Sequence, residues 1–130
     1  MSDDSVTWVV AALEVIAAVG IAVFWIGWLR QPHDEPWLPA GYVDHERPFL
    51  FTDTVLAIVL VAAAILQVAD EPAGESLGLI AAGMLAFLGI LDLAYFVRTG
   101  MFRPDRGGVG NAVVVGGVLL LAAILVVRFL

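Results

Sequence analysis

The chain of 130 residues contains neither cysteine nor lysine. Without cysteine it can form no disulfide, thiolate metal site or thiol redox centre, which excludes a membrane-bound dithiol oxidoreductase. Without lysine it offers no amine for a Schiff base with retinal or pyridoxal phosphate, so both cofactors are excluded. The basic side chains are six arginines against 13 acids, and nucleic-acid binding, which requires a basic face, is not expected.

Polar residues are scarce as well, since hydrophobic residues make up 62% of the chain. Soluble domains are roughly half apolar. Four apolar windows have the length of about 20 residues that a helix needs to span a bilayer. They cover residues 6–29, 49–68, 77–97 and 109–127. The sequence therefore predicts an all-α integral membrane protein, in which residues 1–130 form a single domain, an antiparallel four-helix transmembrane bundle.

The arginines predict how this bundle is oriented. All but Arg128 lie in or beside the first and third connections between the predicted helices. Cytoplasmic connections carry the excess of basic residues, so we expect these two inside and both termini outside. The first five residues, MSDDS, lack the basic residues that open a secretory signal. We therefore expect a multi-pass protein of the cell membrane, surrounded by the lipid bilayer.

The one long connection, residues 31–48, combines four prolines with aromatic residues, two histidines and four acids. Stiff prolines and aromatic anchors are unlike a flexible glycine–serine linker, so we expect this loop to fold against the bundle mouth. His33 and His45 lie among the acids. Their spacing is not that of a catalytic zinc motif, and a solvated acidic loop is the favoured interpretation. We expect no metal site and no cofactor.

Two acids inside predicted helices lie at comparable depths. Asp53 follows Pro48 by five residues, and Asp92 precedes Arg98 by six. At about 1.5 Å per residue, both lie about 8 to 9 Å below the cytoplasmic helix ends. The predicted ligand-binding residues of this zone are Asp53, Asp92, Tyr95, Asn111, Trp25 and Trp28. If the helix faces converge, they line a cytoplasm-facing pocket with paired carboxylates.

The two acids and the two tryptophans also have purely structural interpretations. Asp53 lies about one turn after Pro48 and is suited to cap a helix start. Asp92 can fix helix register through a hydrogen bond to Tyr95, Asn111 or the backbone. Trp25 and Trp28 are suited to an indole belt at the membrane interface, which is the favoured interpretation of the two tryptophans.

Two carboxylates in one low-dielectric pocket cannot both ionise easily, so one of them is expected to hold a proton. Such a pair suits the binding of an amine or of a hydroxyl on a lipophilic ligand. It also suits acid–base chemistry in an isomerisation, or proton movement coupled to a substrate. The leading hypothesis is binding of a small lipophilic or amine-bearing ligand, with or without acid–base catalysis.

Two alternative hypotheses use other residues. Glu14 in the first helix and Gln67 in the second predict a smaller polar site toward the outside, and Glu14 is the proton-coupling candidate of a dimeric proton-coupled small-molecule transporter. Gly108, Ala112 and Gly116 repeat every four residues, a pattern of tight helix contact. Structural packing is the favoured interpretation of this pattern. The third hypothesis is a non-catalytic assembly subunit of a membrane complex that uses this face, and a homo-oligomer is a separate expectation.

The run Phe49-Leu50-Phe51-Thr52-Asp53 places an aromatic–leucine–aromatic motif before an intramembrane acid. In this run and in its four-helix outline, the chain resembles the EXPERA group of membrane proteins, which includes sterol isomerases. The resemblance implies that Asp53 helps to hold an amine or a sterol. It covers five residues of 130, and the predicted orientation differs from that of the group. Small multidrug exporters also have four helices and an acid in the first, but the motif around theirs is missing here.

Overall fold

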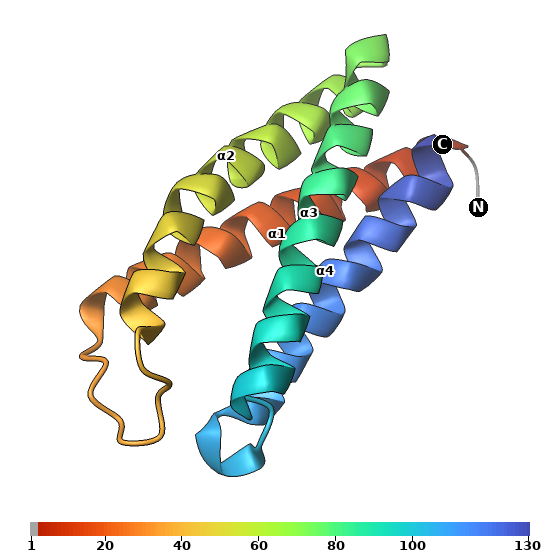
Figure 1. Ribbon diagram of the computed structural model, residues 1–130. Coiled ribbons are helices and arrows are strands. Elements are labelled where there is room, and N and C mark those ends of the chain that lie inside the picture. Colours follow the sequence, from red (N-terminus) through yellow and green to blue (C-terminus); the bar gives the residue numbers. More distant parts are fainter. Residues whose placement is uncertain (1–2) are drawn as a thin grey trace. The chain divides into compact units, whose positions relative to one another are not determined.

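The computed structural model describes residues 3–130, and four long α-helices account for most of them (Figure 1). They are α1 (Asp3–Arg30), α2 (Tyr42–Val68), α3 (Pro72–Thr99) and α4 (Gly108–Phe129), and a short 3-10 helix, η1 (Pro104–Arg106), precedes α4. The prediction of an all-α chain with four long helices is confirmed.

Each of the four α-helices is long and apolar enough to cross a membrane. The shortest, α4, has 22 residues and is about 33 Å long, slightly more than the roughly 30 Å of a hydrocarbon core. Large apolar side chains are exposed on every helix, among them Ile16, Phe51, Phe87 and Val127. Exposed apolar surface of this extent is unfavourable in water and favourable in lipid. These are the features of a multi-pass membrane protein.

The start of α2 differs from its predicted position. The helix begins at Tyr42 and not at Phe49, so the connection after α1 is residues 31–41 and not 31–48. Pro48 suggested the later start because proline has no N–H and usually ends or precedes a helix. Inside α2 it is only the seventh residue. Its missing N–H therefore removes one regular helical hydrogen bond, the one to the carbonyl of Asp44, whose side chain is exposed near the helix start.

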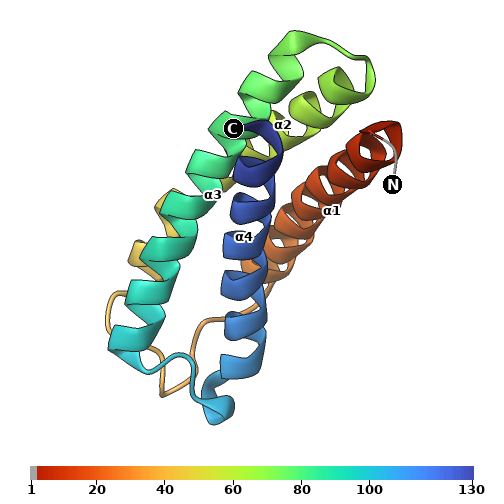
Figure 2. The same cartoon turned by 90° about the vertical axis from the view of Figure 1, so that its right-hand side faces the viewer.

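Contacts divide the chain into two compact units, one ending at Gly78 and the other comprising Leu79–Leu130, so the division falls inside α3. In the first unit, α1 and α2 form an antiparallel hairpin (Figures 1 and 2). In the second unit, the remainder of α3 and α4 run antiparallel and side by side. That all four helices form one bundle and one domain stays a prediction.

The hairpin packs through one narrow face of α2. The buried apolar residues of α2 follow one another at helical spacing and therefore share one face of the helix. They are Leu56, Leu60, Ala63 and Ala64. The buried residues of α1 include Ala11 and Ala18. Small side chains such as these alanines let two helices approach closely, which favours van der Waals contact where lipid removes the hydrophobic driving force.

The turn from α2 to α3 is equally close. The N–H of Glu71 donates to the carbonyl of Leu66 at 2.8 Å, and Asp70 takes a positive φ of 59°. A Cβ on Gly74 would lie 2.6 Å from the backbone N of Gln67 and 2.8 Å from the carbonyl carbon of Leu66. Because these are backbone atoms, no side-chain movement can relieve the overlap. Glycine at this position lets the start of α3 lie directly on the end of α2.

We expect Gly74→Ala to lower the free energy of unfolding by about 1 to 3 kcal/mol, the usual cost of forcing one methyl group into a closed contact. Unfolding by sodium dodecyl sulfate in mixed micelles measures this. Gly20→Ala on α1 is the control, because a Cβ there meets no heavy atom within 4 Å. The control should retain or gain up to about 1 kcal/mol, since alanine favours a helix over glycine. Equal stability of the two variants would contradict the close packing at Gly74.

Candidate functional site

The side chain of Asp53 on α2 has its hydrogen-bond partner on the neighbouring helix, α1. Its Oδ2 accepts a hydrogen bond of 2.8 Å from the indole N–H of Trp25 on α1. Asp53 lies well inside α2, which begins at Tyr42, so the interpretation of Asp53 as a helix cap is wrong. The flanking hydroxyls turn to the backbone of their own helix, Thr52 to the carbonyl of Pro48 and Thr54 to that of Leu50. The partner that orients the Asp53 carboxylate is therefore Trp25.

Trp25 belongs to an aromatic cluster, which we define as Trp25, Trp28, His33 and Tyr42. The ring centroids of Trp25 and Trp28 are 5.2 Å apart with the planes at 66°, and those of Trp28 and His33 are 4.1 Å apart. The Trp28 indole N–H donates to the Tyr42 hydroxyl at 3.1 Å. His33 Nε2 lies 2.9 Å from the carbonyl oxygen of Trp28. The start of the connection thus folds back against the end of α1, and the expectation that the loop folds against a bundle mouth stays a prediction.

The burial of the two tryptophans corrects their favoured interpretation. Trp25 is 4% and Trp28 is 8% exposed, and each donates a hydrogen bond inside the hairpin. An interfacial belt would present its indoles to the surrounding lipid, as Trp8 does with 62% of its surface exposed. Trp25 and Trp28 are not such a belt, because their N–H groups have partners on α2.

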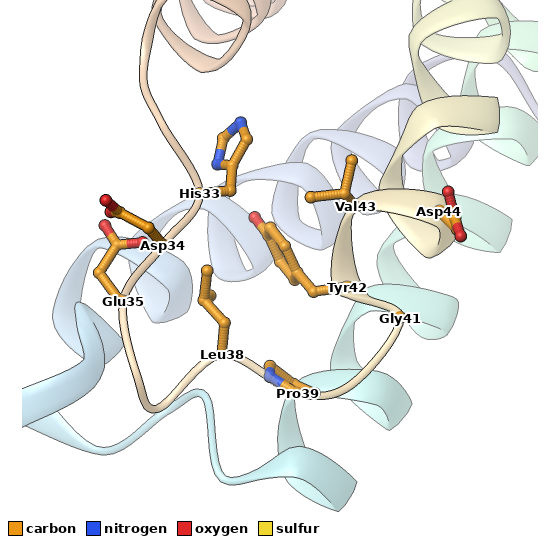
Figure 3. Close-up of a pocket in the computed structure, with 9 residues that line it drawn as sticks. All are labelled: His33, Asp34, Glu35, Leu38, Pro39, Gly41, Tyr42, Val43 and Asp44. Atoms are coloured by element: carbon orange, nitrogen blue, oxygen red, sulfur yellow. The ribbon is translucent and has the colours of Figure 1, made fainter.

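A cavity of about 390 Å³ opens beside the aromatic cluster, formed by the connection and the first residues of α2 (Figure 3). Its size is within the roughly 300 to 1,000 Å³ that small-molecule sites occupy. It is lined by His33, Asp34, Glu35, Leu38, Pro39, Gly41, Tyr42, Val43 and Asp44. In Figure 3 the side chains of Asp34 and Glu35 lie on one side of the opening and Asp44 on the other. The acids surround the cavity without converging on one point, an arrangement that attracts cations without chelating them.

Tyr42 connects this cavity to the intramembrane acid. It lines the cavity and accepts the hydrogen bond of Trp28, whose ring contacts that of Trp25, the donor to Asp53. A carboxylate beside electron-rich aromatic rings is the usual combination for recognising an ammonium group. The residues at this end of the hairpin are thus chemically suited to an amine.

The other end of the hairpin contains a second polar cluster. Glu14 is completely buried, and the side-chain amide of Gln67 donates to its Oε2 at 3.2 Å. The same amide donates to the carbonyl of Gly74 at 3.1 Å. The contact between Glu14 and Gln67 that the sequence predicts is present. Gly74 was not predicted to contribute, because a backbone carbonyl has no sequence signature.

The remaining predicted site residues belong to the second unit. Asp92 and Tyr95 are partly exposed and lie three residues apart on α3, so they project from one side of that helix. Asn111 on α4 donates from its amide to the carbonyl of Met101 at 2.7 Å, which ties α4 to the connection that precedes it. Asn111 thus has a structural partner. That Asp92 joins Asp53 in one pocket stays a prediction.

Sequence reasoning did not identify Tyr42 and His33 as partners of Trp28. The expected loop extended to Pro48, so Tyr42 had no assigned helical position, although it is the first residue of α2. His33 follows Trp28 by five residues, across the end of α1 and across Pro32, where no regular spacing applies. The only available signal was the density of aromatic residues on both sides of the connection.

In comparisons with protein-family models, curated proteins and solved structures, none matched the chain. The resemblance to the EXPERA group therefore gains no support, and the functional argument depends on the residues themselves.

We expect a double-mutant cycle of Trp25→Phe and Asp53→Ala to give a coupling energy of about 0.5 to 3 kcal/mol, the range of a hydrogen bond to a neutral or charged acceptor. Unfolding in mixed micelles measures each corner of the cycle. Trp8→Phe with Asp53→Ala is the matched cycle, because Trp8 is exposed. Its coupling should be within about 0.5 kcal/mol of zero. Similar coupling in both cycles would show that the Trp25–Asp53 bond adds no stability.

Proposed function

We propose that this multi-pass membrane protein binds a small lipophilic or amine-bearing ligand at the end of the α1–α2 hairpin formed by residues 25–53. The observation that carries the proposal is the carboxylate of Asp53, which accepts a hydrogen bond from the Trp25 indole. The Trp25 ring meets that of Trp28 edge to face, and the Trp28 ring lies against that of His33. An acid inside a membrane helix is costly, and such acids usually serve a function. An ammonium group gains both from the carboxylate charge and from the faces of aromatic rings.

The cavity beside Tyr42 supplies an approach for such a ligand. Asp34, Glu35 and Asp44 give its rim a negative charge, which raises the local concentration of cations. Leu38, Pro39 and Val43 line the same cavity and offer apolar contact to a hydrocarbon portion. A ligand with one positive charge and an apolar body matches both features, whereas a free metal ion matches only the first.

The second carboxylate of the proposed pocket is Asp92, with Tyr95 and Asn111 at a similar depth. Its support is the predicted depth of Asp92 in the membrane, where an acidic side chain is costly and usually serves a function. With two carboxylates, one proton can remain while an ammonium group binds. The proposal for Asp53 does not depend on this second acid, so variants of each acid separate the two.

The proposed ligand enters from the cytoplasm, because the positive-inside rule places the first and third connections there and both termini outside the cell membrane. The cysteine-free chain makes this testable with single cysteines. In intact cells, we expect a membrane-impermeant maleimide to label Glu71→Cys in the α2–α3 turn and to leave Ala40→Cys unlabelled. Both positions are exposed. After lysis both should react. The reverse pattern in intact cells would place the cavity outside.

We expect Asp53→Asn/Asp92→Asn to bind n-octylamine at least about tenfold more weakly than the unmodified protein, since loss of about 1.4 kcal/mol corresponds to that factor. Native mass spectrometry in mild detergent measures the dissociation constant. The double variant Asp3→Asn/Asp4→Asn, which neutralises two exposed acids at the start of α1, should bind as before. n-Octanol, which has the same apolar chain but no ammonium group, tests whether binding requires the positive charge of the ligand.

An unchanged dissociation constant in the Asp53→Asn/Asp92→Asn protein would overturn the proposal. The two single variants then show which acid contributes. The same spectra bear on the alternatives, because a ligand-free dimer would favour the transporter hypothesis and a complex with another polypeptide the subunit hypothesis.

A further inference from the structure

The Glu14–Gln67 pair leaves two buried oxygens without a partner. Among residues 3–130, no donor forms a hydrogen bond with Glu14 Oε1 or with Gln67 Oε1. Glu14 is 0% and Gln67 is 8% exposed, so the surroundings do not satisfy these atoms either. Buried polar atoms almost always have a partner, and the exceptions indicate a bound group or a special role.

The orientation of the Gln67 amide follows from its neighbours. Its nitrogen lies 3.2 Å from Glu14 Oε2 and 3.1 Å from the carbonyl oxygen of Gly74. Both are acceptors, so the reversed amide would set its oxygen against two other oxygens. With both amide hydrogens donated, Gln67 retains only its oxygen. The two unpartnered atoms of the pair are therefore both acceptors, and each lacks the donor or cation that a buried oxygen requires.

A metal ion does not suit this place. Hard cations bind six or more oxygens, whereas this pair offers two unpartnered ones. No group of three or more histidine, cysteine or acidic side chains in the part of the chain that the structure describes could hold a metal. A single proton needs only the two oxygens. Bound to Glu14 Oε1, it makes that atom a donor for Gln67 Oε1, and the acid and the amide then join through two hydrogen bonds.

We propose that Glu14 and Gln67 form a proton-binding site, in which a proton on Glu14 Oε1 is shared with Gln67 Oε1 and closes an acid–amide pair between α1 and α2. Through the Gly74 carbonyl, the same amide ties the start of α3 to this pair. No ion pair joins Glu14 to a basic side chain within residues 3–130. The acids of the adjoining turn, Asp70, Glu71 and Glu75, are exposed. Without the proton, the negative charge of the buried Glu14 carboxylate would have no positive charge beside it.

This site goes beyond the proposed ligand binding. Glu14 precedes Trp25 by eleven residues on α1, which separates the two by about 16 Å along the helix. No residue is shared between the acid–amide pair and the aromatic cluster. Failure of one proposal therefore leaves the other intact, and the experiments use different readouts.

Infrared spectroscopy of the protein in lipid at neutral pH tests the proposal, because a protonated carboxyl and a carboxylate absorb at different frequencies. The difference between the unmodified protein and Glu14→Gln should contain the C=O band of one protonated carboxylic acid. Glu71→Gln, the matched exposed control, should leave that band in place. Loss of a carboxylate band in Glu14→Gln would overturn the proposal and indicate a charged Glu14 with bound water. A band that disappears when sodium replaces potassium would overturn it in favour of a cation site.

Glu14→Gln is expected to keep the unfolding midpoint of the unmodified protein, because an amide at position 14 donates to Gln67 Oε1 without needing a proton. Should this variant not fold, Gln67→Leu gives an independent answer. It removes the acceptor of the shared proton and keeps Glu14. The C=O band of the protonated acid should then move to higher frequency, as expected for a carboxylic acid that loses a hydrogen bond. An unchanged band position would contradict sharing of the proton with Gln67.

Discussion

The absence of water in the hydrocarbon core is the constraint on which the rest of this structure depends. A polar side chain on a membrane-crossing helix must find its partner within the protein. Asp53 finds Trp25, Glu14 finds Gln67, and Asn111 finds the carbonyl of Met101. Each of these bonds joins one helix to another segment of its own unit. The polar residues thus add specific bonds to helix contacts that are otherwise formed by buried apolar side chains.

The two acids of the α1–α2 hairpin have different surroundings and so different proposed roles. Asp53 lies beside a cluster of aromatic rings that adjoins an open, acidic cavity, which suits a ligand that arrives from solution. Glu14 is completely buried and is joined to the side-chain amide of Gln67, which suits a proton. The difference in burial therefore distinguishes the proposed ligand site at Asp53 from the proposed proton site at Glu14.

The errors in sequence interpretation have local physical causes. Pro48 suggested that α2 begins after it, yet proline near a helix start costs a single hydrogen bond, and the helix begins at Tyr42. That shift removed the basis for regarding Asp53 as a cap. Trp25 and Trp28 resembled an interfacial belt because the position of a residue along a helix indicates its depth in the membrane. It does not indicate whether the side chain points to lipid or to a neighbouring helix. Their burial depends on Asp53 and Tyr42, which are distant in sequence.

The sequence alone determined that this is a helical protein with four segments able to cross a membrane, because length and hydropathy are local properties. The sequence also predicted that Glu14 and Gln67 form a smaller polar site, and the two side chains are in contact. Only the tertiary structure decided that the Trp25 indole donates to Asp53, that the residue 31–41 connection stacks on Trp28, and that two buried oxygens remain without a donor. These depend on the rotation of each helix about its axis and on the path of an irregular loop, which packing sets and periodicity does not.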